Sequence, residues 1–277
     1  MTTATPDESL DACLATLRRL DHDRFLAALV APAAKRPALV ALYAFNAEIA
    51  RVRETVSEPM LGQIRLQWWR ESIEALERGE ARGHEVIVAL ELAKLPAACL
   101  ITLVDARERD LDDEPFADMA ALETYAEATS SALMRLATLA LGGEDHPAIR
   151  PAGIAYALTG LLRAVPAHAS QGRLYLPLDL LREHDVDPHR IFAGEMSEGL
   201  RSVVNAIAAR ARGLLAEARG IGKVGRASLP ALLPAALCDR YLDIMTAPDF
   251  DPFRRSTDVP AFRRQLRLLG RSFAGRF

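Results

Sequence analysis

The densest group of side chains able to do chemistry is the acidic stretch Asp105–Glu114, which has the sequence DARERDLDDE. Closely spaced carboxylates are the oxygen ligands that Mg²⁺ prefers, so this stretch is a candidate metal site. Arg107 and Arg109 interrupt the acids, however, and Asp105 and Arg109 have the i, i+4 spacing of a helical ion pair. Pro115 follows at once. The pattern therefore favours a charged helix end running into a loop, with a metal site as the alternative.

Other common motifs of catalysis and cofactor binding are missing from the sequence. There is no GxGxxG or Walker loop, no HExxH for zinc and no GxSxG nucleophile elbow. The six histidines do not cluster with cysteines at metal-ligand spacing, and Cys13, Cys99 and Cys238 form no CxxC pair. The net charge is 34 − 37 = −3, so no basic field indicates a nucleic-acid partner. These patterns assign no catalytic residue and no metal ligand.

The elements that would position any site are predicted to be helices along the whole chain. Apolar residues recur at helical spacing within residues 39–49, 61–76 and 122–139, while alternating strand patterns are scarce. Proline and glycine mark the joints and divide the chain into roughly ten to twelve helices. No repeat and no long polar linker interrupts the pattern. We therefore predict one all-α domain over residues 1–277.

No segment has the composition of a membrane span or of a secretion signal. The longest uncharged runs, Pro151–Leu162 and Ala227–Cys238, have 12 residues each, against about 20 for a spanning helix. Asp7, Glu8 and Asp11 stand where a signal peptide would be basic and then apolar. We expect a cytoplasmic protein, with peripheral attachment to the inner membrane as the alternative.

The end of the chain, about residues 258–277, is predicted to form a basic amphipathic helix. Seven arginines and one acid between Phe253 and Phe277 give a local net charge of 7 − 1 = +6. One apolar stripe at i, i+4, i+7 and i+11 consists of Phe262, Leu266, Leu269 and Phe273. Such a helix fits an anionic membrane surface or an acidic partner. The alternative, which a stripe of four residues favours, is a helix packed by its stripe on the core with its arginines in water.

Two separate stretches carry a resemblance to a known family. Leu42–Asn46 (LYAFN) resembles the first helical motif of the squalene/phytoene synthase family. Leu158–Arg163 (LTGLLR) and Gly172–Pro177 (GRLYLP) are similar to that family's LTNxLRDxxEDxxRGRxYLP pattern, and Tyr125 falls in a similar mid-chain segment. The likeness extends over nearly the whole chain. It implies an all-α, isoprenoid-synthase-like helical bundle around a central cavity.

Members of that family hold Mg²⁺ ions on a prenyl diphosphate between two facing acidic motifs, and this chain departs from both. Aligned on the stretches above, the motifs fall on Ala50, Arg51, Glu54, Ala164, Ala167 and His168. Each Mg²⁺ needs hard oxygen ligands, and the charge developing on a leaving diphosphate must be neutralised. One glutamate cannot replace two carboxylate clusters, and Arg51 would repel the ion. We therefore expect no conventional Mg²⁺-dependent condensation.

The replacements themselves resemble one branch of the family, the branch that contains a mitochondrial complex I assembly factor. The likeness rests on Ala44–Val52 (AFNAEIARV), Gln67–Trp69 (QWW), Asp105–Asp113 and Leu162–His168 (LRAVPAH). In that branch an Arg-Ala-x-Pro-x-His run replaces the second acidic motif. The resemblance implies a catalytically degenerate protein that assists complex I assembly or binds lipid beside a membrane, with a complex subunit or assembly intermediate as partner.

Within that fold, cationic side chains would take the place of the metal ions. We expect them to bind an anionic or isoprenoid lipid without a metal cofactor, since arginine binds phosphate through paired donors. The candidate ligand-binding residues are Arg36, Tyr43, Arg51, Glu54, Tyr125, Arg163, His168 and Arg173. The alternative is that Arg51 pairs with Glu48 or Glu54 and only stabilises a relic cavity.

Two other functions remain open at this stage. An active prenyltransferase could condense isoprenyl diphosphates at an atypical site, with Glu54 and Asp110–Asp113 helping to hold Mg²⁺ as cofactor. Alternatively, the chain could be a helical adaptor whose cavity is filled by side chains.

Overall fold

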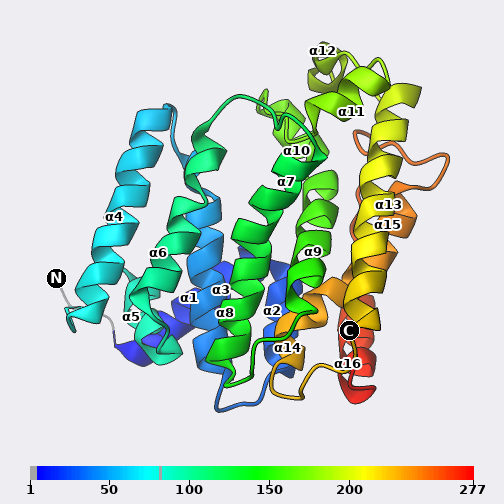
Figure 1. Ribbon diagram of the computed structural model, residues 1–277. Helices are drawn as coiled ribbons and strands as arrows, with labels where there is room; N and C mark the ends of the chain where they lie inside the picture. The colour runs from blue at the N-terminus through cyan, green and yellow to red at the C-terminus, as the bar shows by residue number, and fades with distance from the viewer. Residues whose placement is uncertain (1–4, 81–82) are drawn as a thin grey trace.

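The computed structural model describes residues 5–80 and 83–277, and across those residues it contains helices and no strand. The long helices stand side by side with alternating directions, and the short helices α11 and α12 lie together at one end of the bundle (Figure 1). Helices of eight or more residues are α1 (Pro6–Leu20), α2 (His22–Val30), α3 (Arg36–Ala50), α4 (Pro59–Glu77), α6 (Ala97–Asp105), α7 (Met119–Ala126), α8 (Ala132–Ala140), α9 (Ile149–Arg163), α13 (Glu198–Gly220), α15 (Cys238–Met245) and α16 (Ala261–Phe273).

Shorter segments join these helices. The short α-helices are α5 (Glu85–Leu90), α10 (Val165–Ser170), α11 (Leu178–Glu183), α12 (Pro188–Phe192) and α14 (Leu229–Leu232). The 3₁₀ segments are η1 (Val52–Thr55), η2 (Glu91–Ala93), η3 (Glu108–Leu111) and η5 (Leu233–Leu237), and η4 (Glu127–Ser131) is a π-helical turn between α7 and α8.

The all-α prediction is confirmed, and the predicted joints fall at helix ends. α4 begins at Pro59 and α6 begins directly after Pro96, because proline is tolerated at or before a first turn whose amides have no partner within the helix. The last helix is shorter than the predicted 258–277. It begins behind Pro260, and the chain leaves it at Gly275, whose φ is +65°.

Helix α9 lies in the middle of the bundle, and this position explains why the run Pro151–Leu162 contains no charged residue. It packs on α13 and on η4, and most of its side chains are buried on both sides. A Cβ on Gly153 would collide with the backbone of Ser131, so only glycine permits this close approach of α9 and η4. The hydroxyl of Ser131 donates to the carbonyl of Arg150 at 2.7 Å. This contact fixes α9, and with it the position of Arg163 at its end.

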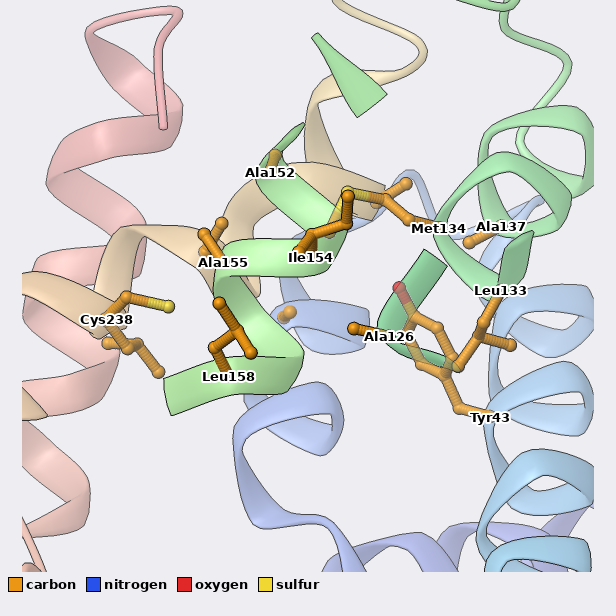
Figure 2. Packing of buried hydrophobic residues seen from close by; sticks show 14 of the residues in the cluster. Tyr43, Ala126, Leu133, Met134, Ala137, Ala152, Ile154, Ala155, Leu158 and Cys238 are labelled. Carbon is orange, nitrogen blue, oxygen red and sulfur yellow. The ribbon is translucent and has the colours of Figure 1, made fainter. Parts of the chain in front are cut away.

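One apolar cluster forms the core and contains residues from Cys13 to Phe277, which supports the proposal of a single domain. Figure 2 shows Tyr43 of α3 and Leu133 of α8 in the same cluster as Leu158 of α9 and Cys238 of α15. Tyr43 is only 1% exposed, so its ring fills the interior beside α3. Among the described residues, the helices are all too short or too polar to cross a membrane.

Candidate functional site

Three of the predicted ligand residues meet around one buried carboxylate. The Asp110 cluster, as we call it, consists of Asn46, Arg107, Asp110, Tyr125, His168, Arg173 and Tyr175. The Asp110 side chain is 6% exposed and pairs with Nη1 of Arg107 at 3.3 Å. Its Oδ1 accepts the hydroxyls of Tyr125 at 2.5 Å and Tyr175 at 3.1 Å. The protein itself therefore supplies the donors that this buried acid requires.

Arginine side chains connect the Asp110 cluster to the surrounding helices. Arg107 donates to Oδ1 of Asn46 on α3 at 3.2 Å and to the hydroxyl of Tyr125 on α7 at 3.0 Å. Arg173, from the segment between α10 and α11, donates to the backbone carbonyl of Asp110 at 2.9 Å and also to the hydroxyl of Tyr175. The cluster thus joins α3, η3, α7 and the α10–α11 segment in one hydrogen-bond network.

His168 contributes a neutral ring to this cluster. Its ring centroid lies 4.4 Å from that of Tyr175. Burial and the neighbouring Arg173 lower the pKa of His168 to about 4, although Asp110 opposes the shift. Burial and Asp110 raise the pKa of Tyr125 well above its usual value, so the phenol stays protonated as a donor. At neutral pH the fixed positive charge of the cluster comes from Arg107 and Arg173 alone.

A second buried acid, Asp23 on α2, organises the other end of the site. The Asp23 cluster consists of Asp23, Arg163, Tyr241 and Arg264. Asp23 is 3% exposed and accepts Nη1 of Arg163 at 3.1 Å, Nη1 of Arg264 at 2.6 Å and the hydroxyl of Tyr241 at 2.8 Å. The Arg163 guanidinium lies 3.8 Å from the centroid of the Tyr241 ring. One carboxylate thereby links α2, α9, α15 and α16.

Two grooves meet at Arg163. One has a volume of about 600 Å³ and is lined by Arg163, Ala164 and Ala167 together with residues 252–258. The other, of about 410 Å³, lies against the Asp23 cluster, and both are lined by Gly160, Arg163 and Asp258. The two alanines that replace acids of the second motif therefore border an arginine-lined groove.

The remaining predicted ligand residues lie apart from these clusters. Arg36, at the start of α3, donates to the carbonyls of Leu29 and Ala31 at 3.0 and 3.1 Å and so caps the end of α2. Arg51 stands at the opposite end of α3, about 20 Å away along the helix. There Nη1 of Arg51 lies 3.6 Å from Oε1 of Glu48, one of the two partners expected for it.

Tyr43 and Glu54 differ in their surroundings. Tyr43 is buried, with the Arg24 guanidinium 5.7 Å from its ring centroid, and burial raises the pKa of its hydroxyl. Glu54 lies exposed in η1. The eight candidate residues therefore do not form one constellation: Tyr125, His168 and Arg173 share the Asp110 cluster, and Arg163 belongs to the Asp23 cluster.

The acids of the stretch Asp105–Glu114 are held by arginines and do not gather into a metal-ligand set. The expected helical pair of Asp105 and Arg109 does not form. Instead Asp105 and Glu108 bind Arg70 at 2.6 and 2.5 Å, and Arg109 pairs with Asp112 at 3.2 Å. Within residues 5–80 and 83–277 there is no group of three or more His, Cys, Asp or Glu side chains placed to hold a metal ion. The residues present therefore do not fit a pair of Mg²⁺ sites.

Comparison with known proteins agrees with the fold. The profile of the family described as Squalene/phytoene synthase matches residues 17–268, so the chain belongs to that family. It is 34% identical over 259 residues to the NADH dehydrogenase (ubiquinone) complex I, assembly factor 6 of Rattus norvegicus, covering 91% of this chain and 78% of the relative.

Synthases of the same family are more distant in sequence. The 15-cis-phytoene synthase of Synechococcus elongatus is 25% identical over 284 residues, covering 94% of this chain and 91% of the relative. The crystal structure of a dehydrosqualene synthase in complex with ligand has a TM-score of 0.81 at 17% identity and covers 97% of this chain and 96% of that chain. The resemblance and the isoprenoid-synthase-like fold expected from the sequence are confirmed.

Sequence reasoning missed the residues on which both clusters depend. Asp23, Tyr241 and Arg264 carry no motif, and their contacts join positions 218 and 241 residues apart in the chain. Asp110 and Arg107 belong to the acidic stretch, and the only signal there for a buried acid is that Asp110 precedes Leu111, the one large apolar side chain of the stretch.

Proposed function

We propose that this protein is an accessory protein of respiratory complex I assembly that performs no Mg²⁺-dependent prenyl condensation. The observation that carries the proposal is the 34% identity to assembly factor 6 over 91% of the chain, against 25% to a phytoene synthase. The proposed partner is a complex I subunit or an assembly intermediate. The proposed location is peripheral, at the membrane in which that complex resides.

The geometry of the site supports the absence of condensation chemistry. Ala164 and Ala167 cannot bind a cation, and Arg51 repels one. The buried acids Asp23 and Asp110 are each engaged by arginine and tyrosine donors, so neither is available to compensate. Developing negative charge on a diphosphate would therefore lack the metal ions that stabilise it in this reaction class.

Deletion of the gene in the source organism tests the accessory role. We expect a loss of fully assembled complex I, measured by native gel electrophoresis and by NADH:ubiquinone oxidoreductase activity in isolated membranes. Wild-type protein and the Glu54→Gln variant should both restore assembly, because no step requires a carboxylate at that position. Normal amounts of complex I in the deletion strain would contradict the proposal.

A second function, binding of an anionic or isoprenoid lipid, is supported by the groove of about 600 Å³ beside Arg163. Arg254 and Arg255 also line this groove, and a phosphate bound there would share the three guanidinium groups with Asp23, Asp251 and Asp249, to which they are paired. Arg163→Ala should weaken binding of an isoprenyl phosphate, measured by isothermal titration calorimetry without divalent metal. Arg51→Ala tests the predicted ligand residue that lies outside the groove. Undiminished binding in both variants would remove this function.

A further inference from the structure

Helix α16 attaches to the bundle through its arginines, the reverse of the packing that its sequence favours. Arg264 binds Asp23 at 2.6 Å, and Arg267 binds Asp239 at 2.6 Å and the carbonyl of Ala236 at 2.5 Å. Leu268 of the same helix is fully buried. The side of α16 that faces the core is therefore mainly an ion-paired side. The expected helix with its arginines in water is wrong for these two residues.

Three of the four residues of the apolar stripe of α16 consequently point away from the protein, while Leu269 is half-buried. Phe262 is 60% exposed, Leu266 is 65% exposed and Phe273 is 89% exposed. These three side chains recur at i, i+4 and i+11 and so lie along one line of the helix. Helix α16 packs on α2 and η5, and in Figure 1 it lies at the lower right edge of the bundle. A row of large exposed apolar side chains is a mark of an interaction surface.

The charges around this stripe are unpaired cations. Arg263 and Arg276 are exposed and have no acidic partner within 4.0 Å among the described residues, unlike Arg264 and Arg267. The surface is thus apolar at its centre and positive at its margin.

A pocket adjoins the end of the stripe. It has a volume of about 480 Å³ and is lined by residues 272–275 of the α16 end, by Lys223 and Arg226 after α13, and by Val30 of α2. Neither Lys223 nor Arg226 has an acidic partner within the parts of the chain that the structure describes. Phe273 therefore stands next to a space large enough for a polar head group and lined by two cations.

We propose that the α16 surface, formed by Phe262, Leu266 and Phe273 with Arg263, Arg276, Lys223 and Arg226, binds an anionic phospholipid membrane. The aromatic and leucine side chains enter the boundary between head groups and acyl chains, and the cations bind lipid phosphates. A phosphate at the 480 Å³ pocket would be held by Lys223 and Arg226. This inference deepens the proposed peripheral location, and it requires no enzymatic activity.

The observations favour a membrane over a protein partner because of the charge pattern. A second copy of this chain would bring like charges together, since its own α16 surface carries the same unpaired cations. The other exposed apolar row, Met60, Ile64 and Trp68 on α4, is flanked by glutamines and by one exposed cation, Arg65, which donates to the hydroxyl of Thr55, so it lacks a margin of several cations. The α4 row therefore provides a matched control of similar exposure and size.

Vesicle co-sedimentation of the purified full chain tests the proposal. Vesicles of phosphatidylcholine with phosphatidylglycerol should bind the protein, while vesicles of phosphatidylcholine alone should bind it at least about tenfold more weakly. The triple variant Phe262→Ser/Leu266→Ser/Phe273→Ser should lose at least about tenfold in binding, since three exposed apolar side chains are removed. Met60→Ser/Ile64→Ser on α4 should bind as the wild type does.

Retained binding in the α16 triple variant, or an equal loss in the α4 variant, would overturn the proposal. So would a triple variant that changes the oligomeric state, measured by light scattering, without changing vesicle binding. All three α16 positions are exposed, and circular dichroism checks that the variants are folded. The vesicle assay contains no complex I, so a negative result would contradict membrane binding only. The accessory role in complex I assembly is tested separately, by the deletion strain.

Discussion

At the scale of single residues, two buried aspartates define the interior chemistry of this protein. Asp23 and Asp110 each accept donors from arginine and tyrosine side chains, and a buried carboxylate without such partners would be strongly destabilising. The sequence shows where acids and arginines occur. It does not show that Arg163 and Arg264 converge on Asp23, because these residues are 140 and 241 positions away from it.

The neutral ring of His168 leads to a prediction at the same scale. Its pKa in the folded protein is about 4, below the ordinary value of 6.5, so the unfolded chain binds the proton more tightly. Its contribution to stability is therefore fully present above pH 6.5 and decreases as the pH falls toward 4. The loss over this window is expected to reach at most roughly 3 kcal/mol. Urea unfolding of the wild type at several pH values measures it.

The variant His168→Gln isolates this contribution, because glutamine does not titrate. The difference in unfolding free energy between wild type and His168→Gln should shrink as the pH falls from 6.5 to 4. His189→Gln, on the exposed side of α12, serves as control and should follow the wild-type pH dependence. A wild-type-to-variant difference that stays constant over this window would show that the ring is not held neutral.

At the scale of secondary-structure elements, periodicity predicts that a helix is amphipathic but not which side faces the core. Periodicity reveals the apolar stripe of α16, and such a stripe ordinarily packs against the core. The helix turns the other way because Asp23 on α2 and Asp239 on α15 offer carboxylates to Arg264 and Arg267. Only the neighbouring elements carry that information. The starts of α4 and α6 are more predictable, because Pro59 and Pro96 determine them through their own backbone geometry and need no neighbouring element.

The close approach of α9 and η4 leads to a prediction about packing. Gly153→Ala places a methyl group against the backbone of Ser131, and that backbone can move only by separating α9 from the π-helical turn. We expect a loss of about 3 kcal/mol in the unfolding free energy. The matched control is Gly160→Ala on the same helix, where an added Cβ meets no atom within 4 Å. Its better helix propensity should stabilise the protein by up to about 1 kcal/mol.

Urea denaturation of both glycine variants measures these changes. Equal stability of Gly153→Ala and wild type would mean that α9 and η4 can separate freely. Because α9 positions Arg163, the Gly153→Ala variant should also perturb the Asp23 cluster. The near-ultraviolet circular dichroism of Tyr241 and its neighbours is expected to change in this variant and to stay unchanged in Gly160→Ala.

At the scale of the whole molecule, the family fold is retained, while the positions aligned with the two acidic motifs carry alanine, arginine or histidine in place of all but one of the acids. The fold could be predicted from helical periodicity together with two short motifs, because a bundle tolerates many substitutions that preserve its apolar positions. The loss of both acidic motifs was also visible in the sequence. The contacts of the eight predicted ligand residues do not follow from the sequence in the same way. A shared motif shows that two chains have the same fold, but it does not fix which groups each side chain contacts.

The replaced centre predicts the outcome of a turnover assay. With farnesyl or geranylgeranyl diphosphate and Mg²⁺, the purified protein should release no pyrophosphate above the protein-free rate, because no carboxylate set among residues 5–80 and 83–277 is placed to hold the metal ions. The phytoene synthase of Synechococcus elongatus, run in parallel, checks the assay. Glu54→Gln should leave the result unchanged. Mg²⁺-dependent release by the wild type that disappears in Glu54→Gln would mean that the exposed Glu54 holds the metal ion, and that the arginines around Asp110 and Asp23 rearrange to admit it.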